Sequence, residues 1–327
     1  MKCTNKLLKF IAVIIMASLF SACSESAEIR VPFSTFIDDY SIHELTLSDS
    51  VSVLNGFSKN LCTFTDDNLD LYKPESVNAG LLIDISSNEV LYSENAFEKV
   101  YPASITKILT AYVALKYCDL DEEITCTSNV SKLRFSDAVS LGLKKGDILT
   151  VDQALNLALL ASYNDVANAI AEHVSGSIEA FAELSNKEAR ALGATGTYFV
   201  NPHGLPDDNH YTTAYDLYLI FNAALQNPKF LEIIQSTDYS TRYHDKNDKD
   251  ITAIAKNTNL FIRGTYELPE GVTVIGGKTG TTTDAGYCLL MLVEDASMNQ
   301  YIAMILGANS RENLYGQMSE LLSHLSN

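Results

Sequence analysis

The chain has 327 residues, of which 46% are hydrophobic and 20% are charged, an ordinary composition for a globular protein. Its formal net charge is -18 at pH 7, from 23 Lys and Arg against 41 Asp and Glu. Nucleic acids are held by clustered basic side chains, so this charge argues against a nucleic-acid partner.

The first 22 residues have the layout of a secretion signal. A basic head with three lysines precedes an apolar run from Phe10 to Phe20, and small residues follow the run. The run has about half of the roughly 20 residues that span a bilayer as a helix. We therefore expect residues 1–22 to be a cleaved signal peptide and the protein to be exported, rather than held by a permanent transmembrane helix.

The signal ends in Phe-Ser-Ala-Cys, which resembles the lipobox of bacterial lipoproteins, where the Cys thiol carries a diacylglycerol. The departure is Phe20, where that motif usually has an aliphatic residue. We expect Cys23 to be the lipid attachment site and to tether the protein to the membrane. Ordinary cleavage nearby, with a chance Cys, is the alternative. Residues 23–75 are polar and acidic without a sustained period, which predicts a tether and a short lead-in.

The folded domain is expected over residues 76–327. Apolar runs at 79–85 and 90–92, separated by polar residues, predict a β-hairpin. Pro102 opens an apolar repeat at three- and four-residue spacing, which predicts a helix ending near Cys118. Further helices are predicted over 152–160, 165–174, 178–192 and 213–224, the first and last with capping signals at Thr150 with Gln153 and Thr213 with Asp216.

Near the C-terminus, apolar runs at 272–275, 286–293 and 301–306 predict successive antiparallel strands, and residues 311–325 predict a last helix. Strands at both ends of the chain with helices between them predict an α/β (α+β) fold. One antiparallel sheet would be built from both termini and flanked by helices, beside a mostly helical insertion.

No metal or cofactor site is predicted. The cysteines beyond Cys23 form no CxxC pair and have no His at metal-ligand spacing. Two of them, Cys118 and Cys126, are close enough in sequence either to form a disulfide or to remain separate buried thiols. The segment from Asp245 begins like a calcium loop, but Lys249 stands at a ligand position and Lys256 where Glu is needed, so a solvated loop is predicted.

Ser104 and Lys107 are the first pair with candidate chemistry. They are three residues apart, so on a helix they share a face, where an amine of lowered pKa can take the serine proton. In the first helical turn, the helix dipole would also favour negative charge near Ser104. The spacing alone is a weak signal, because it occurs by chance about once in a chain of this size.

Two further motifs strengthen the first. Ser162 and Asn164 lie between two predicted helices, where a loop can aim a hydroxyl and an amide into a cleft. Lys278-Thr279-Gly280 follows two glycines at the end of a predicted strand, where a substrate backbone can approach closely. The three motifs in this order are those of penicillin-binding proteins and class A β-lactamases.

From about residue 78 to 321, the chain resembles the low-molecular-mass penicillin-binding proteins that are serine D-Ala-D-Ala carboxypeptidases. This family has the β-lactamase/transpeptidase-like fold. The resemblance rests on four blocks: Tyr101-Pro102-Ala103-Ser104-Ile105-Thr106-Lys107, Phe199-Val200-Asn201-Pro202-His203-Gly204-Leu205-Pro206-Asp207, Asn257-Thr258-Asn259 and Gly277-Lys278-Thr279-Gly280-Thr281-Thr282. Together these blocks are highly specific.

The resemblance implies a catalytic role for five residues. Ser104 would be the nucleophile and Lys107 its base. Ser162 would pass a proton to the departing D-alanine. Asn164 would hold the substrate amide, and Lys278 would keep the site positive and orient Ser162.

The resemblance also implies a binding site for the substrate carboxylate. Thr279 and Thr281 would hydrogen-bond the terminal carboxylate, on either side of Gly280. The backbone amides of Ser104 and Thr281 would form the oxyanion hole. Arg311 matches a family position associated with carboxylate recognition.

The expected activity is removal of the terminal D-alanine from peptidoglycan stem peptides through an acyl-enzyme, with β-lactams as covalent inhibitors. A DD-endopeptidase that cleaves cross-links would use the same motifs and stays open. A β-lactamase is disfavoured because class A enzymes have Asp where this chain has Tyr163. A silent wall-binding lipoprotein is disfavoured because it has no need of an activated nucleophile. His203, a rival base, lies in a predicted tight turn and is expected to be structural.

Family members commonly carry a β-rich domain and a C-terminal amphipathic membrane helix. Only 47 residues follow Gly280 here, enough for two strands and one helix. Both extras are therefore expected to be absent, and a lipid on Cys23 would replace the C-terminal anchor.

Overall fold

The computed structural model describes residues 76–325 except 134, 136 and 137. The predicted signal peptide, Cys23 and the tether lie outside these residues. Within the described part of the chain, no helix is long and apolar enough to cross a membrane. The thiols of Cys118, Cys126 and Cys288 are free, so the first two do not form a disulfide.

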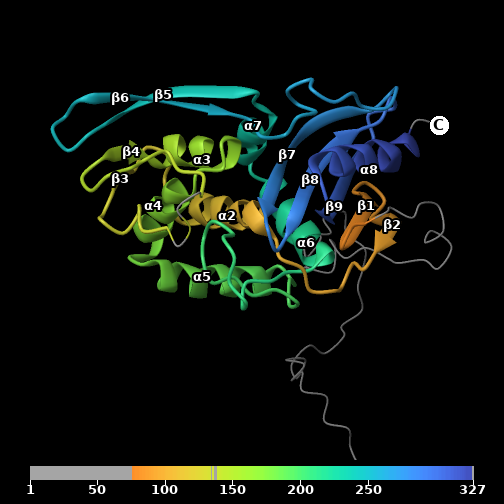
Figure 1. The fold of residues 1–327 in the computed structure, drawn as a ribbon, viewed down its shortest axis with the longest axis horizontal. Coiled ribbons are helices and arrows are strands. Elements are labelled where there is room, and N and C mark those ends of the chain that lie inside the picture. The colour runs from red at the N-terminus through yellow and green to blue at the C-terminus, as the bar shows by residue number, and fades with distance from the viewer. Residues whose placement is uncertain (1–75, 134, 136–137, 326–327) are drawn as a thin grey trace, which may run out of the picture. The chain divides into compact units, whose positions relative to one another are not determined.

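The first sheet has five antiparallel strands and joins the two ends of the described chain (Figure 1). Its order is β2-β1-β9-β8-β7, so the N-terminal hairpin pairs directly with the last strand. The strands are β1 (Ala79–Asp84), β2 (Glu89–Glu94), β7 (Thr273–Thr282), β8 (Gly286–Glu294) and β9 (Gln300–Ala308). This sheet, built from both termini, confirms the predicted fold class.

Both faces of this sheet are covered, and alternate side chains point to each face. On β1, Leu81 and Ile83 belong to the core shared with the helices, whereas Leu82 packs on the opposite face. That opposite face is covered by α8 (Arg311–Ser323), which buries Met318 against the sheet. The continuous apolar runs found in the sequence therefore reflect strands that are buried on both faces.

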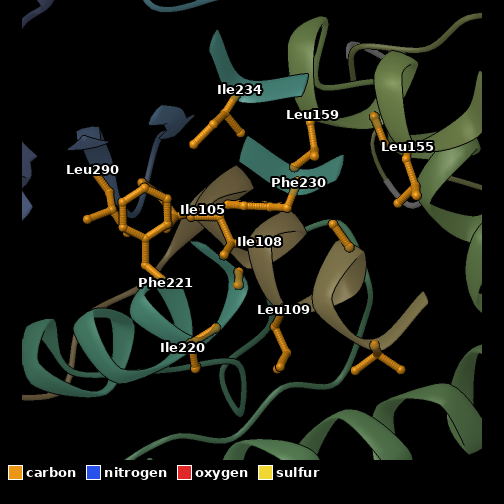
Figure 2. Packing of buried hydrophobic residues seen from close by; sticks show 14 of the residues in the cluster. Ile105, Ile108, Leu109, Leu155, Leu159, Ile220, Phe221, Phe230, Ile234 and Leu290 are labelled. Carbon is orange, nitrogen blue, oxygen red and sulfur yellow. The ribbon is translucent and has the colours of Figure 1, made fainter. Parts of the chain in front are cut away.

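The helical part is built around α2 (Lys107–Tyr117), which packs against five other helices. These are α3 (Val151–Leu160), α4 (Asn164–Ser175), α5 (Ile178–Ala191), α6 (Ala214–Leu225) and α7 (Pro228–Gln235). Figure 2 shows Ile105, Ile108 and Leu109 at the centre of this core, surrounded by side chains from the neighbouring helices and Leu290 of β8. Burial of each such side chain contributes about 1.5–3 kcal/mol.

A second, four-stranded sheet lies in the segment predicted to be mostly helical. Its order is β3-β4-β5-β6, and all pairs are antiparallel. The strands are β3 (Glu123–Thr125), β4 (Ile148–Thr150), β5 (Asp238–His244) and β6 (Asp250–Lys256). The segment after Asp245 is the turn of the long β5–β6 hairpin, and the Asp245 carboxylate accepts hydrogen bonds from its backbone N–H groups. The insertion is mostly helical, as predicted, and this small sheet is the part that the sequence did not predict.

The predicted helices begin close to their predicted capping residues. The side chains and backbones of Thr150 and Gln153 form a reciprocal capping box on α3, and the Thr213 hydroxyl accepts from the Asp216 N–H at the start of α6. The helix predicted from Pro102 differs, because it begins as a separate 3-10 turn, η3 (Ala103–Thr106). Ser104 therefore lies in this 3-10 turn and not in the first turn of α2.

Candidate active site

The turn that carries Ser104 is held in an unusual backbone conformation. Ala103 has a φ of 47°, a left-handed value that non-glycine residues adopt rarely and at a cost. The Thr106 hydroxyl donates to the Ala103 carbonyl at 2.8 Å, and His210 Nε2 lies 2.9 Å from the same hydroxyl. Burial lowers the pKa of His210 to about 4, so this imidazole supports the turn in its neutral form.

Lys107, the first residue of α2, lies beneath Ser104 with only 1% of its surface exposed. Its Nζ atom is 3.0 Å from Ser104 Oγ, 2.8 Å from Asn164 Oδ1 and 2.7 Å from the His203 carbonyl oxygen. The last two atoms are hydrogen-bond acceptors only. A neutral amine has two N–H donors and one lone pair, so these acceptors take both donors and leave the lone pair facing Ser104.

The surroundings of Lys107 favour that neutral amine. Burial lowers the pKa of Lys107 well below its usual value, and the positive charge of Lys278 lowers it further. Asp165 acts in the opposite direction and raises this pKa. Two ammonium groups in one buried site repel each other, so a proton on Lys278 favours the unprotonated form of Lys107.

Lys278 points from β7 to the second serine. Its Nζ atom donates to Ser162 Oγ at 3.1 Å and to the Thr279 carbonyl at 2.9 Å. Burial lowers the pKa of Lys278 to about 7, so both protonation states are within reach at neutral pH. Ser162, between α3 and α4, has a left-handed φ of 64°, so the loop holds this hydroxyl in a costly conformation.

Asn164 and Asp165 open α4 and fasten the neighbouring loop to the site. The Asn164 side-chain amide and backbone N–H both donate to the Val139 carbonyl at 2.9 Å. The buried Asp165 carboxylate accepts from the backbone N–H groups of residues 141, 142 and 143 at 2.8–2.9 Å. Val139 lines the cleft, so these two side chains position one wall of it.

Strand β7 passes directly beside the nucleophile turn. A Cβ atom on Gly280 would lie 3.0 Å from each of the Ala103 Cβ, the Pro102 carbonyl oxygen and the Ser104 nitrogen. The absence of a side chain at Gly280 therefore permits this approach. The motif also lies inside β7, which continues to Thr282, so its predicted position at the end of a strand was wrong.

A cleft of about 380 Å³ opens at Ser104. Ser162, Thr279 and Thr281 line it, together with the exposed guanidinium side chains of Arg263 and Arg311. A second hollow of about 270 Å³ shares Ser104 and continues past Asn164 towards residues 204–206. The serine therefore lies where two hollows meet, with positive charge at one of them.

His203 takes part through its backbone and not through its ring. The Asn201 side chain accepts from the backbone N–H groups of His203 and Gly204, which gives the tight turn that the sequence predicts. His203 Nδ1 accepts from the Leu205 N–H at 3.1 Å. Burial lowers the pKa of His203 well below its usual value. The ring is therefore neutral, and its hydrogen bond with the Leu205 N–H stabilises the turn.

A family model described as D-alanyl-D-alanine carboxypeptidase (Peptidase_S11) matches residues 72–310. The chain belongs to this family. The resemblance to low-molecular-mass penicillin-binding proteins that the motifs indicate is thereby confirmed.

Curated relatives carry the same description. The D-alanyl-D-alanine carboxypeptidase DacF of Bacillus subtilis (strain 168) is 33% identical over 251 residues, which cover 75% of this chain and 60% of the relative. DacC of Escherichia coli (strain K12) is 29% identical over 264 residues, with coverage of 75% and 60%. This carboxypeptidase-family chain therefore spans about 60% of the length of these two relatives.

Solved structures show the same fold. The Streptomyces K15 DD-transpeptidase is 26% identical with a TM-score of 0.71, covering 78% of this chain and 98% of that chain. Penicillin binding protein 5 from Haemophilus influenzae is 27% identical with a TM-score of 0.67, covering 78% and 72%. The β-lactamase/transpeptidase-like architecture predicted from the motifs is confirmed.

The structure of this family member brings the predicted site residues into one region. Ser104, Lys107, Ser162, Asn164 and Lys278 are joined by two hydrogen-bonded clusters, Ser104–Lys107–Asn164 and Ser162–Lys278. Thr279, Gly280, Thr281 and Arg311 line the adjoining cleft.

Sequence reasoning missed four residues that support or line this site. Asp165 fastens the 141–143 backbone, and His210 contacts Thr106. Thr258 accepts a hydrogen bond from the Thr279 hydroxyl at 2.6 Å, and Arg263 adds a second guanidinium to the cleft. Only Thr258 lay in a block already singled out by resemblance. Asp165 and His210 had no local signal, because their partners lie far away in sequence, and Arg263 is marked only by its place on the cleft.

Proposed function

We propose that this protein is a serine-type D-Ala-D-Ala carboxypeptidase that removes the terminal D-alanine from peptidoglycan stem peptides. The observation that carries the proposal is the 3.0 Å approach of Lys107 Nζ to Ser104 Oγ, with both N–H donors of the neutral amine directed to two carbonyl oxygens. A hydroxyl is a weak nucleophile until a base takes its proton, and this arrangement supplies the base.

In the acylation step, Ser104 Oγ attacks the carbonyl carbon of the penultimate D-alanine while its proton moves to Lys107 Nζ. The resulting ammonium keeps acceptors in Asn164 Oδ1 and the His203 carbonyl. The backbone N–H groups of Ser104 and Thr281 would stabilise the oxyanion, and removal of one such donor typically costs about 3 kcal/mol.

Collapse of the tetrahedral intermediate breaks the C–N bond to the terminal D-alanine. The departing nitrogen needs a proton, and the Ser162 hydroxyl is suited to deliver it because Lys278 Nζ lies 3.1 Å behind it. The pKa of Lys278, lowered to about 7 by burial, suits it to replace the proton that Ser162 gives away.

The carboxylate of the leaving D-alanine would be held at the positive side of the cleft. Thr281 offers a hydroxyl donor there, Thr279 would offer one when its proton turns from Thr258 to the carboxylate, and Arg311 and Arg263 supply charge. Thr258 orients the Thr279 side chain through the hydrogen bond between their hydroxyls. A free C-terminus is therefore the substrate feature that this side of the site favours, which is the feature that a carboxypeptidase recognises.

Water then attacks the ester on Ser104 and releases the shortened peptide. Among the described residues that line the two hollows, Asp284 is the one acidic side chain and no glutamate is present. The Tyr163 hydroxyl is turned away and donates to the Ile254 carbonyl at 3.0 Å. A β-lactam that acylates Ser104 is therefore expected to remain as a stable penicilloyl adduct.

An amine in place of water would give transfer or cross-link chemistry from the same acyl-enzyme. The solved Streptomyces K15 neighbour is titled a DD-transpeptidase, which keeps transfer as the second candidate. Incubation with a D-Ala-D-Ala peptide and added glycine separates the two, since a transpeptidase forms the glycine adduct in preference to the hydrolysed peptide. A purified cross-linked peptide dimer tests the endopeptidase alternative, because an endopeptidase would cleave the dimer into its two peptides.

Export and lipidation of the chain are part of the proposal. The basic head, the apolar run and Cys23 support a mature protein that begins at a lipid-bearing Cys23 outside the cytoplasm. Mass spectrometry of the mature N-terminus tests this, with Cys23→Ala as the variant and Cys3→Ala as the matched control. A mature N-terminus at Ser24 or later, without lipid, would contradict it.

The activity is tested with a labelled penicillin and with a peptide that ends in D-Ala-D-Ala. Wild type and Ser240→Ala, which changes an exposed serine on β5, should both form the adduct and release D-alanine. Ser104→Ala should do neither, and a peptide ending in L-Ala-L-Ala should not be cleaved. Release of D-alanine by Ser104→Ala would refute the assignment.

A further inference from the structure

Cys118, Glu122 and His173 form a second cluster of reactive side chains in the described part of the chain. Cys118 follows the last residue of α2, Glu122 lies in the turn before β3, and His173 is in the last turn of α4. One ligand atom from each residue lies within 4.8 Å of the other two. The proposed hydrolysis uses none of these side chains.

The local backbone places the three side chains before any ligand binds. The Cys118 N–H donates to the Ala114 carbonyl at 2.9 Å, which fixes it to the end of α2. Glu122 Oε1 accepts from the Asp119 N–H at 2.6 Å, and this bond directs Oε2 towards His173 Nε2, 3.0 Å away. The carboxylate and the imidazole are therefore held facing each other beside the thiol.

The combination of donors selects a class of metal. A thiolate, an imidazole and a carboxylate suit zinc and other borderline divalent ions, whereas calcium and magnesium take oxygen ligands. A tetrahedral zinc ion separates its ligand atoms by roughly 3.3–3.6 Å, since its bonds to N, O and S measure about 2.0–2.3 Å. The cluster is compact enough for that geometry with small side-chain adjustments.

An ion can also reach the cluster from solvent. The Glu122 side chain is 43% exposed and that of His173 is 21% exposed. The neighbouring chain is acidic, with Asp119, Asp121 and Glu123 beside the turn, and the whole chain carries a net charge of -18. The negative electrostatic potential of these acidic groups attracts cations.

We propose that Cys118 Sγ, Glu122 Oε2 and His173 Nε2 bind a zinc ion, with water as the fourth ligand. The Cys118 thiol would release its proton to solvent as the Zn–S bond forms, and His173 would bind in the neutral form protonated at Nδ1. Sequence spacing gave no sign of this site, because His173 lies 51 residues after Glu122.

The zinc ion would join the C-terminal ends of α2 and α4. These helices pack against each other, and they begin at Lys107 and Asn164, whose side chains share a hydrogen bond of 2.8 Å. The two sites are separated by the length of α2, about 16 Å for its 11 residues. The metal would therefore stabilise the helix pair that carries two proposed catalytic residues without touching the substrate.

Cobalt serves as a spectroscopic probe for this site. The full-length chain, reduced with a non-chelating phosphine, is titrated with Co²⁺ and then with Zn²⁺. Wild type should show a thiolate-to-cobalt charge-transfer band that zinc removes. It should also melt roughly 5–10 °C higher at free zinc about a hundredfold above Kd.

The variant Cys118→Ser should lose the charge-transfer band, and His173→Gln should bind the metal at least about tenfold more weakly. His244→Gln is the matched control, because His244 also lies near two carboxylates, Asp248 and Asp250, but has no thiol partner among them. It should behave as wild type. Circular dichroism melts without metal establish that each variant is folded.

Two results would overturn the zinc site: no charge-transfer band in the wild type, or a band that persists in Cys118→Ser and so comes from another cysteine. Neither result depends on D-alanine release or penicillin binding.

Discussion

The amine of Lys107 lies 2.7 Å from the backbone carbonyl oxygen of His203, so the turn around His203 contacts the proposed base through its backbone. A contact made by the backbone carbonyl is kept when the side chain is replaced. If the imidazole ring were the base, its replacement would remove the base. His203→Asn should therefore acylate with a labelled penicillin within about tenfold of wild type, because Asn can still accept from the Leu205 N–H.

The opposite result would be informative. Removal of a true general base in a serine enzyme costs about 10⁴-fold or more. A loss of that size in His203→Asn, in protein that still melts cooperatively, would restore the histidine as a candidate base and contradict the role given to Lys107.

Asp165 should be a positioning residue of measurable importance. In Asp165→Asn, an NH₂ group would face backbone N–H donors of the 141–143 segment, so we expect a loss of about 2–3 kcal/mol in unfolding free energy and a raised KM for peptide. Because Asp165 raises the pKa of Lys107, the variant should also shift the acid limb of acylation to lower pH. Urea denaturation and a pH profile measure both effects.

Asp152→Asn is the matched control for this change. Asp152 forms a partly exposed ion pair with Lys229 at 2.7 Å, which is worth no more than about 1 kcal/mol. Equal behaviour of the two variants would show that Asp165 has no special role in the site.

Gly280→Ala should separate catalysis from stability. The added Cβ would lie 3.0 Å from the Ser104 nitrogen, so the proposed oxyanion donor must move. We expect acylation to fall about 10²–10³-fold. Gly316→Ala adds a methyl group on α8 with no heavy atom within 4 Å, so it should leave acylation unchanged and stabilise the helix by up to about 1 kcal/mol. Stopped-flow labelling with a fluorescent penicillin would show whether the two variants differ.

Lys278 should make stability depend on pH. Burial lowers the pKa of Lys278 from 10.5 to about 7, so between these values the unfolded chain binds more protons than the folded one. The folded state is therefore penalised at pH 7, and this penalty fades as pH rises towards 10.5. At pH 7, Lys278→Met should unfold at a higher urea concentration than wild type, with a free energy of unfolding that is larger by about 2–4 kcal/mol. This gain should be smaller at pH 9.5.

The exposed Lys246→Met provides the control, and it should show no such pH-dependent difference. A stability difference for Lys278→Met that is the same at both pH values would mean that the amine is not held below its ordinary pKa. In that case the cost of burying it would have to be met by a partner that the described contacts do not include.

The sequence predicted the elements whose signals are local. The capping box at Thr150 and the N-cap at Thr213 mark the starts of two helices, and the apolar runs of β1, β8 and β9 mark buried strands. The long β5–β6 hairpin was missed because it is largely exposed and its strands, such as 238–244, are rich in polar residues. Helix α7 was missed although Asn227 caps it and Pro228 begins it, which is a usable signal.

The chemistry of the site was predictable in kind but not in arrangement. The spacing of Ser104 and Lys107 predicted a shared face, yet the structure separates them into a 3-10 turn and the start of α2. No local pattern could predict that the Lys107 amine meets both Asn164 and the His203 carbonyl, because these partners lie 57 and 96 residues further along the chain. Tertiary packing supplies them.

The central claim is that Lys107 is a neutral base when Ser104 attacks, and the pH dependence of acylation tests it most directly. Second-order rate constants with a labelled penicillin should already be near their plateau at neutral pH and fall only on the acid side, because the pKa of Lys107 is lowered by burial and by Lys278. Lys107→Arg, which keeps the charge but cannot deprotonate, should lose at least about 10³-fold throughout. A wild-type rate that climbs tenfold per pH unit towards the ordinary lysine value of about 10.4, or an arginine variant within tenfold of wild type, would contradict the account.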